Sequence, residues 1–113
     1  MDDDCLFCRI VAGDVPADVV LETRKTLAFR DISPQAPVHV LVVPKEHHRD
    51  LGALAAADQQ LAAELLETLR AVAEQEGLAH YRIVFNTGEG AGQSVFHVHG
   101  HVLGGRPMGW PPG

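Results

Sequence analysis

The chain has 113 residues, of which 46% are apolar and 5% aromatic, and its formal net charge is −6. This length suits one domain, residues 1–113, with a core packed mainly from aliphatic side chains. The acidic balance excludes broad nucleic-acid binding, which requires a basic face. No apolar run approaches the roughly 20 residues of a membrane helix, and the acidic start "MDDDC" is unlike a signal peptide. We therefore expect a soluble cytoplasmic protein that contacts neither nucleic acid nor membrane.

The first half of the chain is predicted to form a short helix and three strands. "CLFCRIVAGDVPADV" is typical of a short helix that ends at Gly13. "VVLET" and "TLAFRDI", residues 19–23 and 26–32, predict a hairpin around a polar turn. "SPQAP" is a loop, because its two prolines do not suit a central strand. "VHVLVVP" then predicts a buried strand that ends at Pro44.

The second half is predicted to form a long helix and two more strands. Asp58 is the expected N-cap of the helix and Gly77 the residue just beyond its end, while "LGALAAA" before it adds a short turn. One apolar face of this helix follows from spacings of 4, 4 and 3: Leu61, Leu65, Leu69 and Val72. "YRIVFN" and "VFHVHGHVL" predict strands joined by a glycine-rich loop, without a long crossover. The predicted fold class is α+β, with a five-stranded antiparallel sheet and two helices.

Three histidines alternate in the last predicted strand. On a strand His97, His99 and His101 share one face at intervals of about 6.5–7 Å, whereas Val98 and Val102 face the core. A solvated edge face normally has a mixed composition, so it explains the pattern poorly. Two of the rings could ligate one metal ion, but three span about 13–14 Å, which is too long for one centre. A catalytic row is the interpretation that remains.

A neutral imidazole is a nucleophile when one ring nitrogen holds the proton and the other is free. Neighbouring histidines disfavour each other's charged forms, which helps to keep a central ring neutral. Because His99 has a neighbour on both sides, it is the predicted nucleophile.

The glycine-rich loop "NTGEGAGQSV", residues 86–95, directly precedes the histidines. It opens a strand and not a helix, which excludes a Rossmann fingerprint, and no Lys-Ser or Lys-Thr follows that would indicate a Walker motif. Gln93 and Ser94 lie where side chains and backbone N–H groups can hold phosphate oxygens. Taken alone, Ser94 would be an ordinary turn residue.

Three segments together resemble one known family: "CLFCRIVAGDVPA", "FRDISPQAPVHVLVVPKEH" (residues 29–47) and "NTGEGAGQSVFHVHGHVLGGRPMGWPPG" (residues 86–113). "HVHGHVL" matches the histidine-triad pattern, and the chain is similar to the histidine-triad nucleotide-binding branch of the purine nucleoside phosphoramidase type. Gly100 departs from this pattern, which usually has a bulky apolar residue there. The departure puts the packing of the opposite face in question and not the chemistry.

The resemblance implies a HIT-like fold whose sheet continues across a homodimer. It also implies a hydrolase that binds purine nucleoside monophosphates and cleaves the P–N bond of purine nucleoside 5′-phosphoramidates. The reaction passes through a nucleotidyl-histidine intermediate, releases the monophosphate and an amine, and needs no magnesium. In this scheme His99 attacks phosphorus, His101 lies beside the phosphate, and His39 orients the triad and couples its protons.

The resemblance implies a wider nucleotide site as well, made of Asp31, Phe29, Ile32, Asn86, Gln93, Ser94 and Trp110. Asp31 would accept the ribose hydroxyls, as an ionised carboxylate can. Phe29 and Ile32 would line the base pocket, although simple core residues would look nearly the same. Asn86, Gln93 and Ser94 would contact the phosphate or leaving group, and Trp110 would approach the site of a partner subunit.

Cys5 and Cys8 form a C-x-x-C pair, which alone fits either a redox pair or two incidental thiols. A tetrahedral zinc needs two more ligands. The resemblance supplies them from His97 and from the "PKEH" segment, where His47 is preferred to His48. It therefore implies a structural zinc held by Cys5, Cys8, His47 and His97.

Two other functions stay open at this point. A dinucleoside polyphosphate hydrolase or nucleotidyl transferase of the same superfamily would use the same histidines, although "GQSV" and the "WPPG" tail favour the phosphoramidate type. A purine-nucleotide-binding regulatory module with incidental catalysis would keep the same pocket.

Overall fold

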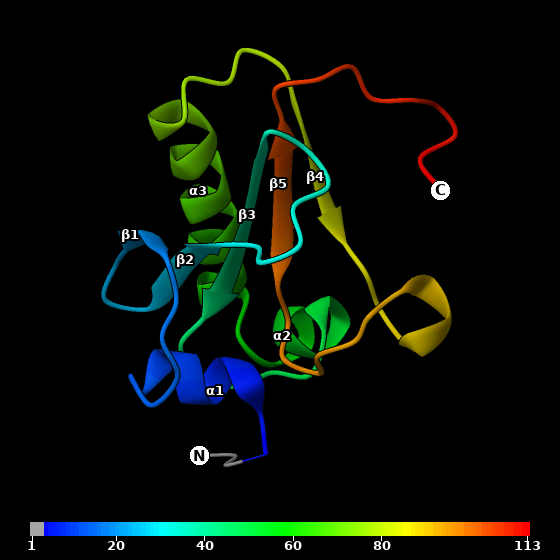
Figure 1. The fold of residues 1–113 in the computed structure, drawn as a ribbon. Coiled ribbons are helices and arrows are strands. Elements are labelled where there is room, and N and C mark those ends of the chain that lie inside the picture. The colour runs from blue at the N-terminus through cyan, green and yellow to red at the C-terminus, as the bar shows by residue number, and fades with distance from the viewer. Residues whose placement is uncertain (1–3) are drawn as a thin grey trace.

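The protein folds around one five-stranded antiparallel sheet. In the computed structural model, which describes residues 4–113, the strands lie in the order β1-β2-β3-β5-β4 (Figure 1). The strands are β1 (Val19–Glu22), β2 (Thr26–Arg30), β3 (Val38–Pro44), β4 (Tyr81–Phe85) and β5 (Gly100–Gly104). The helices are α1 (Leu6–Val11), α2 (Leu51–Ala57) and α3 (Gln59–Gln75), with a short 3₁₀ turn, η1 (Glu89–Ala91). Within residues 4–113 no helix has both the length and the apolar character to cross a membrane.

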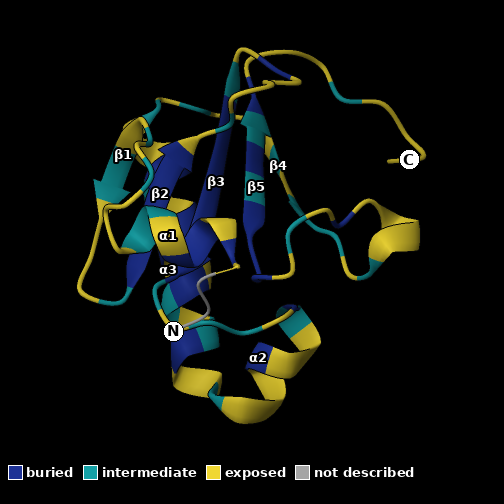
Figure 2. Ribbon diagram, turned by 60° about the horizontal axis from the view of Figure 1, so that its bottom comes forward, coloured by how far each residue is buried: buried dark blue, intermediate teal, exposed yellow. Residues whose placement is uncertain are grey.

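The long helix α3 covers one face of β2, β3 and β5. Its boundaries are those predicted: the Asp58 side chain accepts a hydrogen bond from the Leu61 N–H at 3.0 Å, and Gly77 follows the end with φ +71°. The core between helix and sheet contains Ala28, Val40, Val42, Leu54, Leu61, Leu65, Leu69, Val72, Ala73, Val98 and Val102. Figure 2 shows β3 and β5 largely buried, with η1 and most of α2 exposed.

The opposite face of the sheet packs against α1. A second cluster of buried residues joins that helix to β2 and β3: Cys5, Phe7, Cys8, Leu27, Phe29, Leu41 and Val43. Because side chains alternate along a strand, His39 of β3 emerges on this face together with Leu41. His101 of β5 emerges there too, since Val102 faces α3. The α1 face is therefore the face that carries chemistry.

Two predicted elements have different bounds in the structure. Residues 51–57 form a separate helix, α2, whose N-cap Asp50 accepts from the Ala53 N–H at 2.9 Å. The described chain thus has three α-helices where two were predicted. The hairpin strands end at Glu22 and Arg30, slightly short of the predicted bounds.

The last strand begins at Gly100, later than predicted. Gly100 pairs with Val42 of β3 and with Phe85, the last residue of β4. If the same register continued two residues toward the start of the chain, Val98 would lie opposite Pro44, which has no N–H to continue the ladder. The Val98 N–H instead donates to the His48 carbonyl at 2.7 Å. Two of the three triad histidines therefore lie on irregular chain just before β5.

Gly100 leaves room for two core side chains. A Cβ at this position would lie 2.8 Å from Phe85 Cζ and 2.9 Å from Leu69 Cδ1. Both neighbours lie on the α3 side of the sheet, away from the histidines. The space of the bulky residue expected from the family pattern is therefore filled from β4 and α3.

Replacing Gly100 by leucine is expected to lower the free energy of unfolding by about 1–3 kcal/mol, because it overpacks this contact. Urea denaturation measures the change. Gly90→Leu is the matched control, since a Cβ there meets nothing within 4 Å, and it should shift stability by less than about 0.5 kcal/mol. Adding Phe85→Ala to Gly100→Leu should restore part of the loss, and a Gly100→Leu protein as stable as the wild type would contradict this account.

Candidate active site

A cavity of about 700 Å³ opens on the α1 face of the sheet. This volume lies in the range of small-molecule sites. Its apolar wall consists of Leu6, Phe7, Ile10, Val15, Pro16, Ala17, Phe29, Ile32, Leu41 and Val95. Its polar members are Asp18, Arg30, Asp31, Ser94, His99 and His101. A mostly apolar wall with a few polar side chains is what a ligand with one apolar and one polar end requires.

His99 is a neutral ring with a fixed proton. Its Nδ1 lies 2.8 Å from the carbonyl oxygen of His97. A carbonyl only accepts, so Nδ1 holds the proton and Nε2 keeps a lone pair. Phe7 packs edge-on against the ring, with centroids 5.0 Å apart, and no other hydrogen bond engages the ring within residues 4–113. Burial lowers the pKa of His99, so it is burial more than the neighbouring rings that keeps this nitrogen free for attack.

His39 and His101 form a second ordered pair, joined diagonally between β3 and β5. The backbone N–H of Gln35 donates to His39 Nδ1 at 3.0 Å, so the single proton of neutral His39 lies on Nε2. His39 Nε2 is 2.9 Å from His101 Nδ1, which must therefore accept. His101 then carries its own proton on Nε2, an atom that is buried and without a hydrogen-bond partner in the described chain. The pair thus presents one unused N–H donor.

Asp31 completes this group without forming an ion pair. Its Oδ2 lies 3.4 Å from His39 Nε2, and its Oδ1 accepts from the Ser33 N–H at 2.7 Å. Burial lowers the pKa of His39 by more than Asp31 raises it, so the ring is neutral near pH 7. Asp31, His39 and His101 are close enough to suggest a metal site. The Gln35 contact argues against one, because it places a proton on the His39 nitrogen that would have to ligate.

The four residues implied as zinc ligands meet beneath α1. Cys5 Sγ lies 3.3 Å from His97 Nδ1, and Cys8 Sγ lies 3.4 Å from His47 Nδ1 and 3.5 Å from His97 Nδ1. One ligand atom from each residue lies within 4.8 Å of the other three. Around a tetrahedral zinc, sulfur and nitrogen ligands are expected about 3.6 Å apart. The geometry and the soft donor set therefore fit a zinc ion.

The orientation of the histidines in this cluster also suits a metal. His97 Nε2 donates to the Pro44 carbonyl at 2.7 Å, which leaves the Nδ1 lone pair directed at the cysteines. Burial lowers the pKa of His97 to about 4, with smaller contributions from nearby histidines. His48 points elsewhere, with Nε2 2.7 Å from Glu46 Oε1. The structure thus brings His47, the preferred residue, into the cluster.

Gln93 holds the glycine-rich loop in place. Its Nε2 donates to the carbonyls of Arg49 at 2.8 Å and Val95 at 3.1 Å. Its Oε1 accepts from the Gly88 N–H at 2.8 Å, and its own backbone N–H donates to the Gly88 carbonyl at 3.0 Å. In this arrangement no N–H of Gln93 is available to a phosphate, contrary to the sequence-based expectation. Gln93 instead places Ser94 at the cavity wall.

Three other residues that were expected to contact the nucleotide differ in exposure and in their position relative to the cavity. Ile32 lines the cavity but is 98% exposed, so it can cover a ligand and is not core. Asn86 is half-buried, and its amide lies beside Gly92 and outside the cavity lining. Trp110 is 83% exposed on a tail that leaves the sheet on the β4 side (Figure 1). Its role at the site of a partner subunit stays a prediction.

The contribution of α1 to the cavity was not predicted from the sequence. Leu6, Phe7 and Ile10 line it, although only the cysteines of this segment had been singled out. The signal was present, because Phe7 and Ile10 are three residues apart and so lie on one side of a helix. The backbone N–H of Gln35 was also missed, and side-chain types carry no signal for it.

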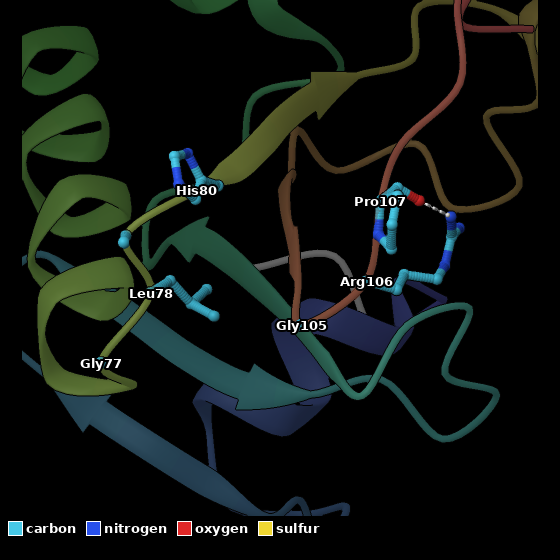
Figure 3. Close-up of a pocket in the computed structure, with 7 residues that line it drawn as sticks. Gly77, Leu78, His80, Gly105, Arg106 and Pro107 are labelled. Atoms are coloured by element: carbon cyan, nitrogen blue, oxygen red, sulfur yellow. Dashed lines mark hydrogen bonds between the residues drawn. The ribbon is translucent and has the colours of Figure 1, made fainter.

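A second cavity, of about 430 Å³, lies at the far end of the sheet (Figure 3). Its walls are Gly77, Leu78, Ala79, His80, Gly105, Arg106 and Pro107. Arg106 is already engaged, donating to the carbonyls of Gln35 at 3.0 Å and Pro107 at 2.9 Å. With no oriented group comparable to His99, this cavity is not the candidate site.

An antiparallel α+β sheet that presents ordered neutral histidines to an apolar cavity defines a histidine-triad type of site. Comparison with known proteins agrees: the HIT domain family matches residues 12–108, so the chain belongs to this family. The crystal structure of a HIT family hydrolase from Legionella pneumophila has a TM-score of 0.92 and 49% identity, covering 97% of this chain and 100% of that one. The predicted family and fold class are thereby confirmed.

Two curated relatives have informative names. The "14 kDa zinc-binding protein" of Zea mays is 47% identical over 99% of this chain and 90% of its own length. "Adenylylsulfatase HINT1" of Arabidopsis thaliana is 46% identical over 99% of this chain and 78% of its own length. These names describe proteins to which this chain is similar.

Acidification is expected to weaken the fold through His101. Burial, together with repulsion from His99 and His39 when those rings are protonated, lowers the pKa of this ring from 6.5 to about 4. The unfolded ring therefore binds a proton near pH 6.5 and the folded ring only near pH 4, so the free energy of unfolding falls as the pH drops between these values. Between pH 7 and pH 5 the loss should be on the order of 1 kcal/mol, allowing for partial solvation.

Urea denaturation at the two pH values measures this loss. His101→Asn should reduce the pH dependence, whereas His80→Asn, at an exposed position, should leave it as in the wild type. An unchanged pH dependence in His101→Asn would show that this ring is not responsible.

Proposed function

We propose that this protein hydrolyses purine nucleoside 5′-phosphoramidates, such as those of adenosine, through a nucleotidyl intermediate on His99. The observation that carries the proposal is the neutral His99 ring at the cavity wall, with Nδ1–H held by the His97 carbonyl and Nε2 unused. The unused Nε2–H donor of His101 lies beside it, with ring centroids 5.1 Å apart. Membership of the HIT family supports the same chemistry.

Different parts of the cavity lining suit the base, the ribose and the phosphate of a nucleotide. The apolar wall from α1 and β2, including Phe7, Ile10 and Phe29, suits a purine base. Asp31 keeps lone pairs that can accept the ribose hydroxyls. Ser94 and the two histidines then surround the phosphate.

In the proposed reaction His99 Nε2 forms a bond to phosphorus as the P–N bond breaks. The leaving nitrogen departs as an amine with a proton taken from solvent, because neutral His101 would become an unfavourable anion if it gave up its own. His101 Nε2–H donates to a phosphoryl oxygen and stabilises the developing charge. Water then attacks phosphorus and loses a proton to solvent, the bond from phosphorus to Nε2 breaks, and His99 leaves as a neutral ring as the monophosphate is released.

His99→Asn tests the enzyme hypothesis. We expect kcat/KM for adenosine 5′-phosphoramidate to fall roughly a thousandfold or more, because the nucleophile is lost, while AMP affinity by calorimetry changes little. Acid-quenched wild-type enzyme should carry an adenylyl group on His99, detected by mass spectrometry. His80→Asn is the control and should retain full turnover. Wild-type protein that binds AMP without turning over the phosphoramidate would instead indicate a regulatory nucleotide-binding module.

A second candidate substrate is adenylyl sulfate, favoured by the name of the Arabidopsis relative. It presents the same nucleotide and phosphorus to His99, with sulfate as the leaving group. Measuring its hydrolysis beside that of the phosphoramidate and of a dinucleoside polyphosphate ranks the three reactions.

We further propose that Cys5, Cys8, His47 and His97 hold a structural zinc ion. The close approach of their ligand atoms and the Zea mays relative named for zinc binding support this. A bound ion would cross-link α1 to the segments after β3 and before β5 and would take no part in the reaction.

The adjacent histidines His47 and His48 provide a matched test. Purified protein should contain about one zinc per chain by elemental analysis. His47→Asn should lose the metal and lower the thermal midpoint by at least several degrees, because about 1 kcal/mol shifts the midpoint of a domain slightly above 100 residues by roughly 4 °C. His48→Asn should retain both. Equal zinc contents in the two variants, or a wild type without zinc, would overturn the assignment.

We also propose that a second copy of the chain continues the sheet at β4. In the part of the chain that the structure describes, β4 pairs only with β5, so its outer backbone groups are available to another strand. Tyr81 and Ile83 on this strand are 41% and 38% exposed, and the tail with Trp110 leaves on the same side (Figure 1).

A further inference from the structure

One backbone N–H decides where the protons of the His39–His101 pair lie. The Gln35 N–H donates to His39 Nδ1 at 3.0 Å. An N–H cannot face a second N–H at this distance, so Nδ1 cannot take a proton while the contact lasts. His39 therefore holds its single proton on Nε2, 2.9 Å from His101 Nδ1.

The loop that carries this N–H is firmly held. The prolines at 34 and 37 flank Gln35 and restrict the backbone. The Gln35 side chain donates to the Ser33 carbonyl at 2.9 Å, and the Gln35 carbonyl accepts from Arg106 Nε at 3.0 Å. The side chain itself is exposed, so its identity matters less than its backbone position.

The charged and titratable groups around His39 explain why the Gln35 N–H affects the protonation of this ring. Asp31 Oδ2 lies 3.4 Å from Nε2 and attracts a second proton to the ring. His101 on the other side, itself next to His99, disfavours a charged neighbour, and Arg106 lies one step further away, on the Gln35 carbonyl. The Gln35 N–H opposes Asp31 by occupying the only nitrogen on which a second proton could sit.

We propose that Gln35 is a positioning residue whose backbone N–H keeps His39 singly protonated on Nε2 and thereby makes His101 a donor through Nε2. The assignment of that donor to a phosphoryl oxygen rests on the proposed function, but the proton order does not. Gln35 contacts no reacting atom and acts only through His39 and His101.

Nitrogen-15 NMR of the wild-type protein tests the proton order directly. Correlations between ring nitrogens and ring protons distinguish the two tautomers of each histidine. We expect Nε2–H in His39 and His101 and Nδ1–H in His99 at pH 7, with the pKa of His39 below its ordinary value. A proton on Nδ1 of His101 or of His39 would overturn the proposal without any variant being made.

Gln35→Pro and Gln35→Ala separate the backbone from the side chain. Proline removes the N–H, whereas alanine keeps it and removes only the contact to Ser33. In Gln35→Pro the proton affinity of His39 should rise roughly tenfold, the effect of one hydrogen bond. The kcat of Gln35→Pro should fall about five- to tenfold, with KM within about twofold. Gln35→Ala should match the wild type in the proton affinity of His39, in kcat and in KM. Equal His39 titration in the two variants would overturn the proposal.

Replacement of the residue-35 N–H by an ester oxygen repeats the test with the Gln side chain retained, should the proline variant fail to fold. The NMR readouts also distinguish the two levels of inference. If no substrate is turned over but the tautomers and titrations are as expected, the proposed function fails and the role of Gln35 stands. If turnover is normal and the tautomers are not as expected, only the role of Gln35 fails.

Discussion

The site depends on where single protons lie on four imidazole rings, of which His39, His97 and His99 are buried and His101 is half-buried. Burial lowers the pKa of each ring, so all four are neutral near pH 7 and each has one N–H and one lone pair. Backbone groups choose the nitrogen: carbonyls accept from His97 and His99, and an amide donates to His39. The tautomer of His101 is set by His39, whose Nε2–H donates to His101 Nδ1. Because backbone groups cannot change their donor or acceptor character, this arrangement of protons is built into the fold.

His97 connects the cysteine cluster to the cavity that His99 lines. Its ring faces Cys5 and Cys8, while its backbone carbonyl holds the proton of His99. The helix α1 makes the same connection from the other side, because it supplies both cysteines and the wall residues Phe7 and Ile10. A disturbance of the cysteine cluster would therefore reach His99 through one residue and the cavity wall through one helix.

The sequence predicted the features that repeat along the chain. The apolar face of α3 and the inward side chains of Val98 and Val102 follow from helical and strand periodicity and are confirmed. The cap at Asp58, predicted from the capping preference of Asp, is confirmed as well. The meeting of Cys5 with His97 followed from family resemblance, since no local pattern connects residues so far apart. What periodicity missed depends on single backbone contacts, such as the start of β5 opposite Pro44 and the engagement of Gln93 within its own loop.

The same proton order bears on which leaving groups the proposed enzyme can accept. His101, with a pKa of about 4, is neutral at pH 7 and has only its Nε2 proton to offer. It can stabilise charge on a phosphoryl oxygen but cannot protonate a leaving atom without becoming an anion. A substrate must therefore release a group that departs unaided, as sulfate does, or one that takes its proton from solvent, as the nitrogen of a phosphoramidate does. The bridging oxygen of a simple phosphate diester is far less basic than that nitrogen and is not protonated by solvent before it leaves, so we expect the proposed enzyme to cleave simple diesters poorly.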